Sequence, residues 1–321
     1  MSNFAKGLTV LAALVAMTAN SVAGELPVWA YPVADSGVEA ARDDGQVQHV
    51  PNSTVALTRK QIEAHGSAVP DWHPEEHPVM PGIVAKGREP QVWACGYCHL
   101  PSGAGRPENA SLAGLTPAYI RQQLIDFRNG DRPGSEPKRA PQAFMIALAK
   151  AATDAEVTEA ANYFATIKPA CFIKVVEVTA VPKTFVAGAM LARAPGGDME
   201  PIGNRIIEVP EELGRAENRD SRTPYLAYVP VGSLQKGAEL VLTGGGGQTQ
   251  LCAACHGPDL KGLADVPRLA GRSPSYLMRQ LYDVRHGTRT GLSSVPMKAV
   301  VANLTEEDMV AIAAYLASRE P

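Results

Sequence analysis

Apolar residues recur at helical spacing in two matching pairs of segments. Residues 117–130 and 274–287 each begin with a proline, carry apolar and aromatic residues on one face, and end at a glycine. Residues 153–167 and 305–318 each begin with a threonine followed by acidic residues, and Ala, Leu, Ile and aromatic side chains then occupy one face. The pattern predicts a mainly helical chain with two matched helical regions.

The segment between these regions has a different pattern. Residues 172–179 and 205–209 alternate or are rich in β-branched side chains, which is typical of strands. A connection as long as residues 170–234 without structure of its own would be unusual. We therefore expect an ordered insert that contains some β-structure, and it could cover a site, fix the domain arrangement or dock a partner.

The first 23 residues have the pattern of a secretory signal peptide. Lys6 gives a positive start, an apolar run extends from Leu8 to Met17, and small residues stand at Ser21 and Ala23. Crossing a bilayer takes about twenty apolar residues, which is longer than this run. We expect cleavage near Ala23, export to the periplasm, and a mature chain without an integral membrane segment.

An internal repeat divides the remainder of the chain. Residues 95–132 align without a gap with residues 252–289, and after a shift in register residues 145–169 align with residues 297–321. A repeat of this length indicates duplicated domains rather than a solenoid.

The repeat predicts the domain boundaries. After the signal peptide (1–23) we expect an N-terminal extension (24–82), a first domain (83–169), the insert (170–234) and a second domain (235–321). The net charge of −3 lacks the concentrated basic character of nucleic-acid-binding proteins. Aromatic residues make up only 6% of the chain, so we expect something other than aromatic side chains to help fill two small cores.

Four of the five cysteines occupy equivalent positions in the two copies. Each copy contains a C-x-x-C-H motif, formed by Cys95, Cys98 and His99 in the first and by Cys252, Cys255 and His256 in the second. This spacing lets two thiols form thioethers to one haem while the adjacent histidine ligates the iron. A thioredoxin-like motif followed by a chance histidine, and a Cys₂His zinc site, are the weaker alternatives.

A methionine is the expected sixth ligand in each copy. Met145 aligns with Met297, and each follows a Gly/Pro/Ser-rich loop in a stretch that we expect to be irregular. The thioether is a soft ligand that favours ferrous iron, although most methionines only fill gaps in cores. Met278 and Met309 have no methionine at the matching position, so we interpret them as packing residues.

The order of these motifs is similar to that of a known family. C-x-x-C-H, Leu-Ala-Gly, Pro-x-Tyr, Gln-Leu, Arg-x-Gly-x-Arg, a Met and a terminal Ala-Tyr helix resemble class I cytochrome c, and in particular the dihaem cytochrome c4 and c553-type proteins. The resemblance implies two helical domains wrapped on two covalently attached haem c groups. It also implies the axial pairs His99/Met145 and His256/Met297.

The same resemblance implies a hydrogen bond behind each proximal histidine. In the second copy the Pro267 carbonyl would accept the Nδ1–H of His256. The first copy departs from the pattern because Ala110 stands in place of this proline, although its carbonyl can serve equally.

Two classes of function fit this ligand set. The first is an electron carrier that passes single electrons between a donor, such as a dehydrogenase or a quinol-oxidising complex, and an acceptor, such as a terminal oxidase. The second is a dihaem redox enzyme: thiosulfate dehydrogenases use a cysteine at one iron, which would require Cys171 to displace Met145, and peroxidases need one open iron. A cytochrome subunit of a periplasmic dehydrogenase is a third possibility. The matched methionines favour the carrier.

Other features have structural explanations. His73 and His77 lie among prolines and acids, and a structured turn is favoured over a metal site. The run Gly244–Gly247 lacks the residues of a phosphate loop and is expected to be a connector. His286 is expected at a surface helix end. Cys171 is otherwise a buried residue or an intermolecular disulfide partner. Two arginine pairs could bind haem propionates or lie on the surface: Arg128 with Arg132, and Arg285 with Arg289.

Overall fold

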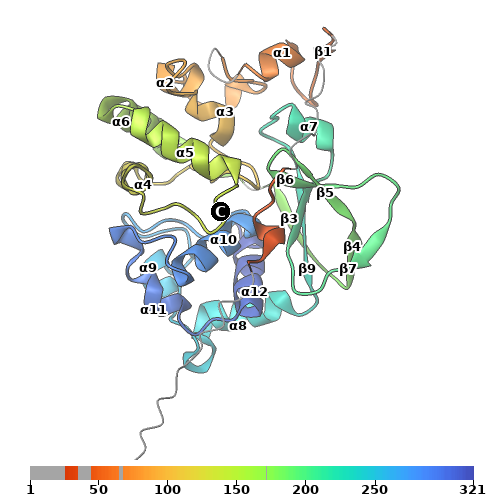
Figure 1. The fold of residues 1–321 in the computed structure, drawn as a ribbon, viewed down its shortest axis with the longest axis vertical. Helices are drawn as coiled ribbons and strands as arrows, with labels where there is room; N and C mark the ends of the chain where they lie inside the picture. The colour runs from red at the N-terminus through yellow and green to blue at the C-terminus, as the bar shows by residue number, and fades with distance from the viewer. Residues whose placement is uncertain (1–25, 35–44, 65–67, 171) are drawn as a thin grey trace, which may run out of the picture.

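The computed structural model describes residues 26–34, 45–64, 68–170 and 172–321, and it shows two helical halves with a strand-rich segment along one side (Figure 1). The predicted signal peptide and Cys171 lie outside the described residues. Among the described residues, no helix is both long enough and apolar enough to cross a bilayer. The prediction of a mainly helical chain with an inserted β-segment is confirmed.

The first helical half follows the predicted helix signals. Its elements are α2 (Gly82–Ala85), α3 (Cys95–His99), α4 (Pro117–Asn129), α5 (Ala140–Ala151) and α6 (Asp154–Thr166). Thr116 caps α4 by accepting from the Tyr119 amide, and Gly130 ends it in the left-handed conformation. Thr153 forms a capping box with Glu156 at the start of α6. Apolar side chains of α2, α4 and α6 form the core of this half.

The second half repeats this arrangement with a longer first helix. It contains α8 (Ser233–Thr243), α9 (Ala253–His256), α10 (Pro274–Arg285), α11 (Met297–Val301) and α12 (Glu306–Ala317), with short 3₁₀ turns η3 (Gly245–Gly247) and η4 (Leu292–Ser294). Gly237 of α8 lies against the backbone of α12, where an added Cβ would overlap the Ala311 carbonyl. Its counterpart in the first copy, Gly87, instead follows the short helix α2 with a φ of +70°. The two copies therefore begin differently.

One expectation about the repeated methionines is wrong. Met145 does not lie in an irregular stretch but inside the helix α5. The segment 140–151 is rich in Ala, Leu, Met and Lys, which favour helix, and Pro141 stands in its first turn. Met297 is the first residue of the short helix α11.

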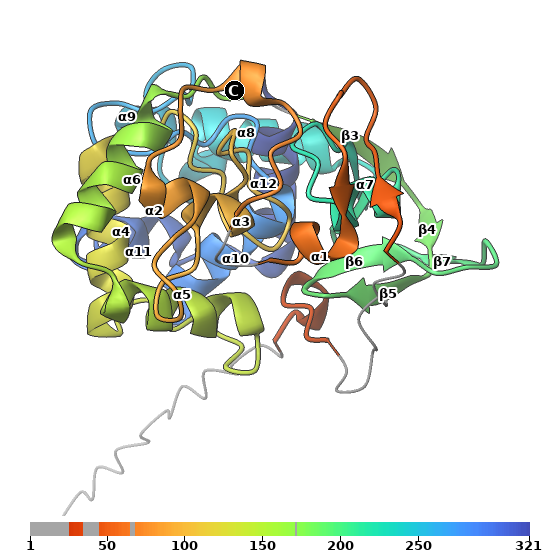
Figure 2. The same ribbon diagram turned by 90° about the horizontal axis from the view of Figure 1, so that it is seen from above.

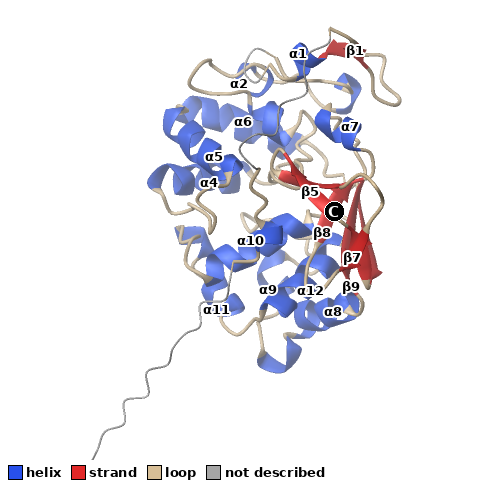
Figure 3. Cartoon of the chain, turned by 45° about the vertical axis from the view of Figure 1, so that its right-hand side comes forward, coloured by secondary structure: helices blue, strands red, loops and turns tan. Residues whose placement is uncertain are grey.

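The insert contains a small mixed sheet and two further pairs of strands. β3 (Ile173–Val178) pairs in parallel with β9 (Tyr225–Pro230), which pairs antiparallel with β8 (Ile207–Pro210). Antiparallel pairs join β4 (Ala180–Pro182) to β7 (Met199–Pro201) and β5 (Thr184–Ala187) to β6 (Met190–Arg193), and α7 (Leu213–Glu217) precedes β9. Both predicted strand segments are therefore strands. The strands lie together along one side of the molecule (Figure 3), and the three-stranded sheet contacts α10 and α12 of the second half.

The N-terminal extension packs on two separate regions. Residues 26–34, with the turn η1 (Val28–Ala30), join the core of the second half, where the Tyr31 hydroxyl donates to Asp283 at 2.7 Å. Residues 45–64 and 68–82 lie across the first half and the insert (Figure 2). They contain β1 (Val47–Gln48), β2 (Leu57–Thr58), α1 (Arg59–Ile62) and the turn η2 (Pro74–Glu76).

Candidate haem-binding sites

The first C-x-x-C-H motif forms the short helix α3. Cys95 and Cys98 are partly buried thiols, and burial raises the pKa of Cys95 to about 12. His99 is buried, and its Nδ1 lies 2.8 Å from the Ala110 carbonyl oxygen, so Nδ1 carries the proton and donates it. Burial lowers the pKa of His99, which favours the neutral ring with a free lone pair on Nε2. This is the state that an imidazole needs to ligate a metal.

A large cavity brings the predicted residues of the first copy together. Its volume is about 940 Å³, and Cys95, Cys98, His99 and Met145 all line it. Apolar residues of α2, α4, α5 and α6 form part of its wall, including Ile83, Ile120, Leu124, Leu148, Val157 and Phe164. Two thiols, a neutral imidazole, a thioether and an apolar wall in one cavity fit a covalently attached haem.

The second motif has the same local geometry. Cys252 precedes α9 and Cys255 lies within it, and the Nδ1 of the buried His256 lies 2.7 Å from the Pro267 carbonyl oxygen. Burial lowers the pKa of His256 as it does that of His99. Met297 and Cys252 both pack against the core of this half, whereas Met278 and Met309 are fully buried within that core. The carbonyl acceptors behind both histidines are therefore present.

The two halves meet through a reciprocal set of hydrogen bonds, in which arginines that follow α4 and α10 donate to side chains of both helices. Arg132 donates to Gln123 of its own half at 2.9 Å and to Gln280 of the other half at 2.7 Å. Arg289 donates to Gln280 at 3.1 Å and to Gln123 at 3.0 Å. Each arginine also reaches a tyrosine of the other half, Tyr276 or Tyr119. The junction has approximate two-fold symmetry.

These arginines lie close to the proximal histidines. The charge of Arg132 helps to lower the pKa of His99, and the charges of Arg272 and Arg289 help to lower that of His256. The Nε–H groups of Arg272 and Arg289 are buried, and no described residue accepts a hydrogen bond from them. Buried donors without acceptors are costly, so they fit an acidic group held between the halves, such as a haem propionate.

Arg128 and Arg285 have different surroundings from Arg132 and Arg289. Arg128 donates to the carbonyls of Ala149 and Ala152 and pairs with the exposed Asp154, and Arg285 is exposed. The two interpretations of the arginine pairs therefore apply to different members: Arg128 and Arg285 are structural or surface residues, whereas Arg132 and Arg289 lie at the junction.

Sequence reasoning missed the contribution of the extension and the insert to the first cavity. Arg59, Phe185, Met190 and Arg219 line it together with the residues of the first half. The guanidinium of Arg219 lies 3.5 Å from the centroid of the Tyr97 ring, inside the first motif. The contact between Arg219 and Tyr97 joins residues 122 positions apart, and no local pattern in the sequence indicates it.

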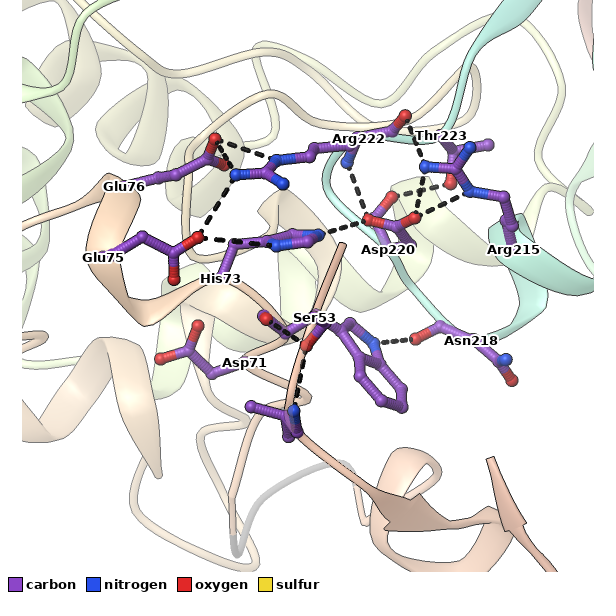
Figure 4. Close-up of polar contacts among 12 residues, drawn as sticks. Ser53, Asp71, His73, Glu75, Glu76, Arg215, Asn218, Asp220, Arg222 and Thr223 are labelled. Atoms are coloured by element: carbon purple, nitrogen blue, oxygen red, sulfur yellow. Dashed lines mark hydrogen bonds and ion pairs between the residues drawn. The ribbon is translucent and has the colours of Figure 1, made fainter. Parts of the chain in front are cut away.

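The histidines of the extension have separate partners. His73 Nε2 lies 3.0 Å from Asp220 (Figure 4), and His77 Nε2 lies 3.0 Å from Asp71. Within the described ranges, no group of three or more His, Cys, Asp or Glu side chains could hold a metal ion. The turn η2 at this place fits the expected structured turn. His286 ends α10, is exposed and stacks on Tyr282.

Comparisons with known proteins agree with this geometry. The family model "Cytochrome c" matches residues 235–320. Cytochrome c-554(548) of Halomonas halodenitrificans is 41% identical over 70 residues, which cover 22% of this chain and 84% of that protein.

Longer relatives match in part or over most of their length. Cytochrome c4 of Azotobacter vinelandii is 34% identical over 84 residues, but the match spans only 24% of this chain and 40% of that protein. The thiosulfate dehydrogenase electron acceptor of Thiomonas intermedia is 25% identical over 233 residues, which cover 72% of this chain and 80% of that protein.

Proposed function

Because the chain belongs to the cytochrome c family and binds two haem c groups covalently, we propose that it is an exported dihaem carrier of single electrons. The observation that carries the proposal is the repeated geometry of the two motifs, in which each histidine donates through Nδ1 to a carbonyl and keeps Nε2 for a metal. A bound haem supplies reversible exchange of one electron between ferric and ferrous iron.

Each copy of the repeat would hold one haem through two cysteines, a histidine and a methionine. Cys95 and Cys98, and Cys252 and Cys255, tether the haems through thioethers. His99 and His256 are the proximal ligands, and the hydrogen bonds from their Nδ1 atoms fix the orientation of the rings. Met145 and Met297 would supply the thioether ligands, and a haem held by both a histidine and a methionine would have no position left for a substrate.

The junction between the halves supports transfer within the molecule. Arg132 and Arg289 hold α4 and α10 together and lie near the two proximal histidines, where they can neutralise the haem propionates. We therefore propose that these residues hold the two halves so that an electron could pass between the haems that they would bind. The predicted signal peptide supports a carrier in the periplasm, where we propose a donor oxidoreductase and a terminal oxidase or another acceptor as its partners.

The ligand assignment is tested by counting haems and recording ferric spectra. We expect two haems per chain and a methionine–iron charge-transfer band from each. Met145→Ala and Met297→Ala should each remove about half of this band. Met278→Leu, which changes a buried methionine of the core, is the matched control and should leave the band intact. A band that survives in either alanine variant would contradict the assignment of that methionine.

Turnover assays on the wild type and its variants distinguish an electron carrier from a redox enzyme. A carrier is reduced and reoxidised by protein partners but does not turn over thiosulfate or peroxide. Rapid turnover of either compound, abolished by Cys171→Ala or Met145→Ala, would replace the carrier by a dihaem enzyme.

A further inference from the structure

Arg219 of the insert reaches the turn that tethers the first haem. Its guanidinium carbon lies 3.5 Å from the centroid of the Tyr97 ring, and its Nη1 donates to the Tyr97 carbonyl at 2.9 Å. Tyr97 stands between Cys95 and Cys98, and Arg219 lines the same cavity as both cysteines. A positive charge is therefore held at the cysteine edge of the first site.

The glutamates that line the cavity do not form ion pairs with Arg219. Among the residues that the structure describes, no carboxylate lies within ion-pair distance of Arg219. The other charged side chains that line the cavity are Arg59, Glu63, Arg106, Glu108, Glu156 and Glu217. Arg106 pairs with Glu108 at 3.2 Å, and Glu156 pairs with Arg88 at 2.7 Å. Removing Arg219 would leave the unpaired groups of this lining with a net negative charge.

The chain around Arg219 is held on both sides. Arg219 itself has a φ of +57°, a strained conformation for a residue other than glycine. The carbonyl of Asn218 accepts from Trp72 at 2.6 Å, and its side chain accepts from Arg59 at 2.9 Å. On the other side, the buried Asp220 accepts from His73 and Arg215 (Figure 4). The extension and the insert together fix the backbone from which Arg219 projects.

The second copy has no counterpart of this contact at its motif. Ala254 stands where the first copy has Tyr97, so there is no ring on which a guanidinium could stack. Cys255 is exposed, whereas Cys98 is partly buried. The insert therefore places a guanidinium on the first motif, whereas the second motif offers no ring for the same contact.

We propose that Arg219 raises the reduction potential of the first haem and so biases an electron shared by the two haems toward the first. A nearby positive charge stabilises ferrous iron relative to ferric iron because reduction removes one positive charge from the site. The inference rests on the proposed dihaem carrier. It gives residues 45–82 and the insert a function, which is to hold one charge at one haem.

The test is a redox titration of the complete protein and of Arg219→Gln. The methionine methyl resonance of each ferrous haem is followed through the titration by nuclear magnetic resonance. Assignment of the two resonances with Met145→Ala and Met297→Ala lets each haem be followed separately. We expect the distribution of an electron between the haems to shift away from the first by on the order of tenfold, which corresponds to about 59 mV for one electron. The potential of the second haem should change little.

A matched variant controls for the loss of a positive charge elsewhere in the insert. Arg205→Gln removes an arginine that bonds to Glu200 and to the Pro201 carbonyl and does not line the cavity, so both potentials should be retained. Arg219→Lys keeps the charge and should recover most of the wild-type difference. If Arg219→Gln does not load two haems, Tyr97→Ala, which reproduces the alanine of the second motif, should give a smaller shift in the same direction.

Two results would overturn the inference. One is an unchanged difference between the two potentials in Arg219→Gln, or in Tyr97→Ala where that variant replaces it. The other is an equal shift in Arg205→Gln. A wild-type protein that lacks two methionine-ligated haems would instead contradict the proposed function, so the two failures are distinguishable.

Discussion

The close contact between α8 and α12 determines whether Gly237→Ala raises or lowers the free energy of unfolding. Gly237 is buried where α8 meets α12, and a Cβ there would overlap the backbone carbonyl of Ala311 and the Cβ of Tyr315. Gly237→Ala should gain up to about 1 kcal/mol of helix propensity. It should lose about 1–3 kcal/mol because the backbones must separate. The expected net change is a loss of about 1–2 kcal/mol in the free energy of unfolding.

A second glycine provides the control for this substitution. Gly214 lies in α7, is exposed and has no atom within 4 Å of an added Cβ. Gly214→Ala should therefore stabilise the protein by about 0.5 kcal/mol. Urea unfolding of the haem-loaded proteins, followed by far-ultraviolet circular dichroism and haem absorbance, measures both changes. A Gly237→Ala protein with a midpoint at or above that of the wild type would refute close backbone packing between α8 and α12.

Three further predictions test the buried polar groups. Burial raises the pKa of Glu208, so the folded protein holds a proton that the unfolded chain releases, and stability should fall as the pH rises above the ordinary glutamate value; Glu208→Gln should flatten this dependence in urea midpoints measured at several pH values. At the junction, Gln123→Ala and Gln280→Ala should be coupled by about 0.5–3 kcal/mol in a double-mutant cycle, and simple additivity would contradict the shared arginines. Asp220→Ala should cost about 3–5 kcal/mol because it leaves the buried His73 and the partly buried Arg215 without their shared partner, whereas the exposed Glu75→Ala should cost less than about 1 kcal/mol; equal urea midpoints for these two variants would be the contrary result.

The sequence predicted the features that depend on local chemistry. Thr153 and Thr305 cap helices through capping boxes, as their positions before acidic residues indicate. The alternation in residues 172–179 corresponds to β3. The carbonyls of Ala110 and Pro267 lie where the resemblance places acceptors for the histidines. Each of these features is decided within a dozen residues along the chain.

The features that escaped prediction depend on distant contacts. Met145 was expected in an irregular stretch because a Gly/Pro/Ser-rich loop precedes it, but the helix-forming residues that follow that loop outweigh it. The stacking of Arg219 on Tyr97 joins the insert to a turn 122 positions away. The burial of Arg132 arises only when the two halves meet, and a single copy of the repeat contains no signal for it.

The crossed hydrogen bonds at the junction also constrain how a duplicated sequence of this kind can diverge. Each glutamine serves the arginine of its own copy and the arginine of the other, so neither copy satisfies its buried groups alone. A substitution at one of these positions therefore alters hydrogen bonds in both copies, and a compensating change can arise in the opposite copy. After duplication, we expect substitutions at these four positions to depend on one another. The α2 end of the first copy and the α8 end of the second are outside this set and were free to become different.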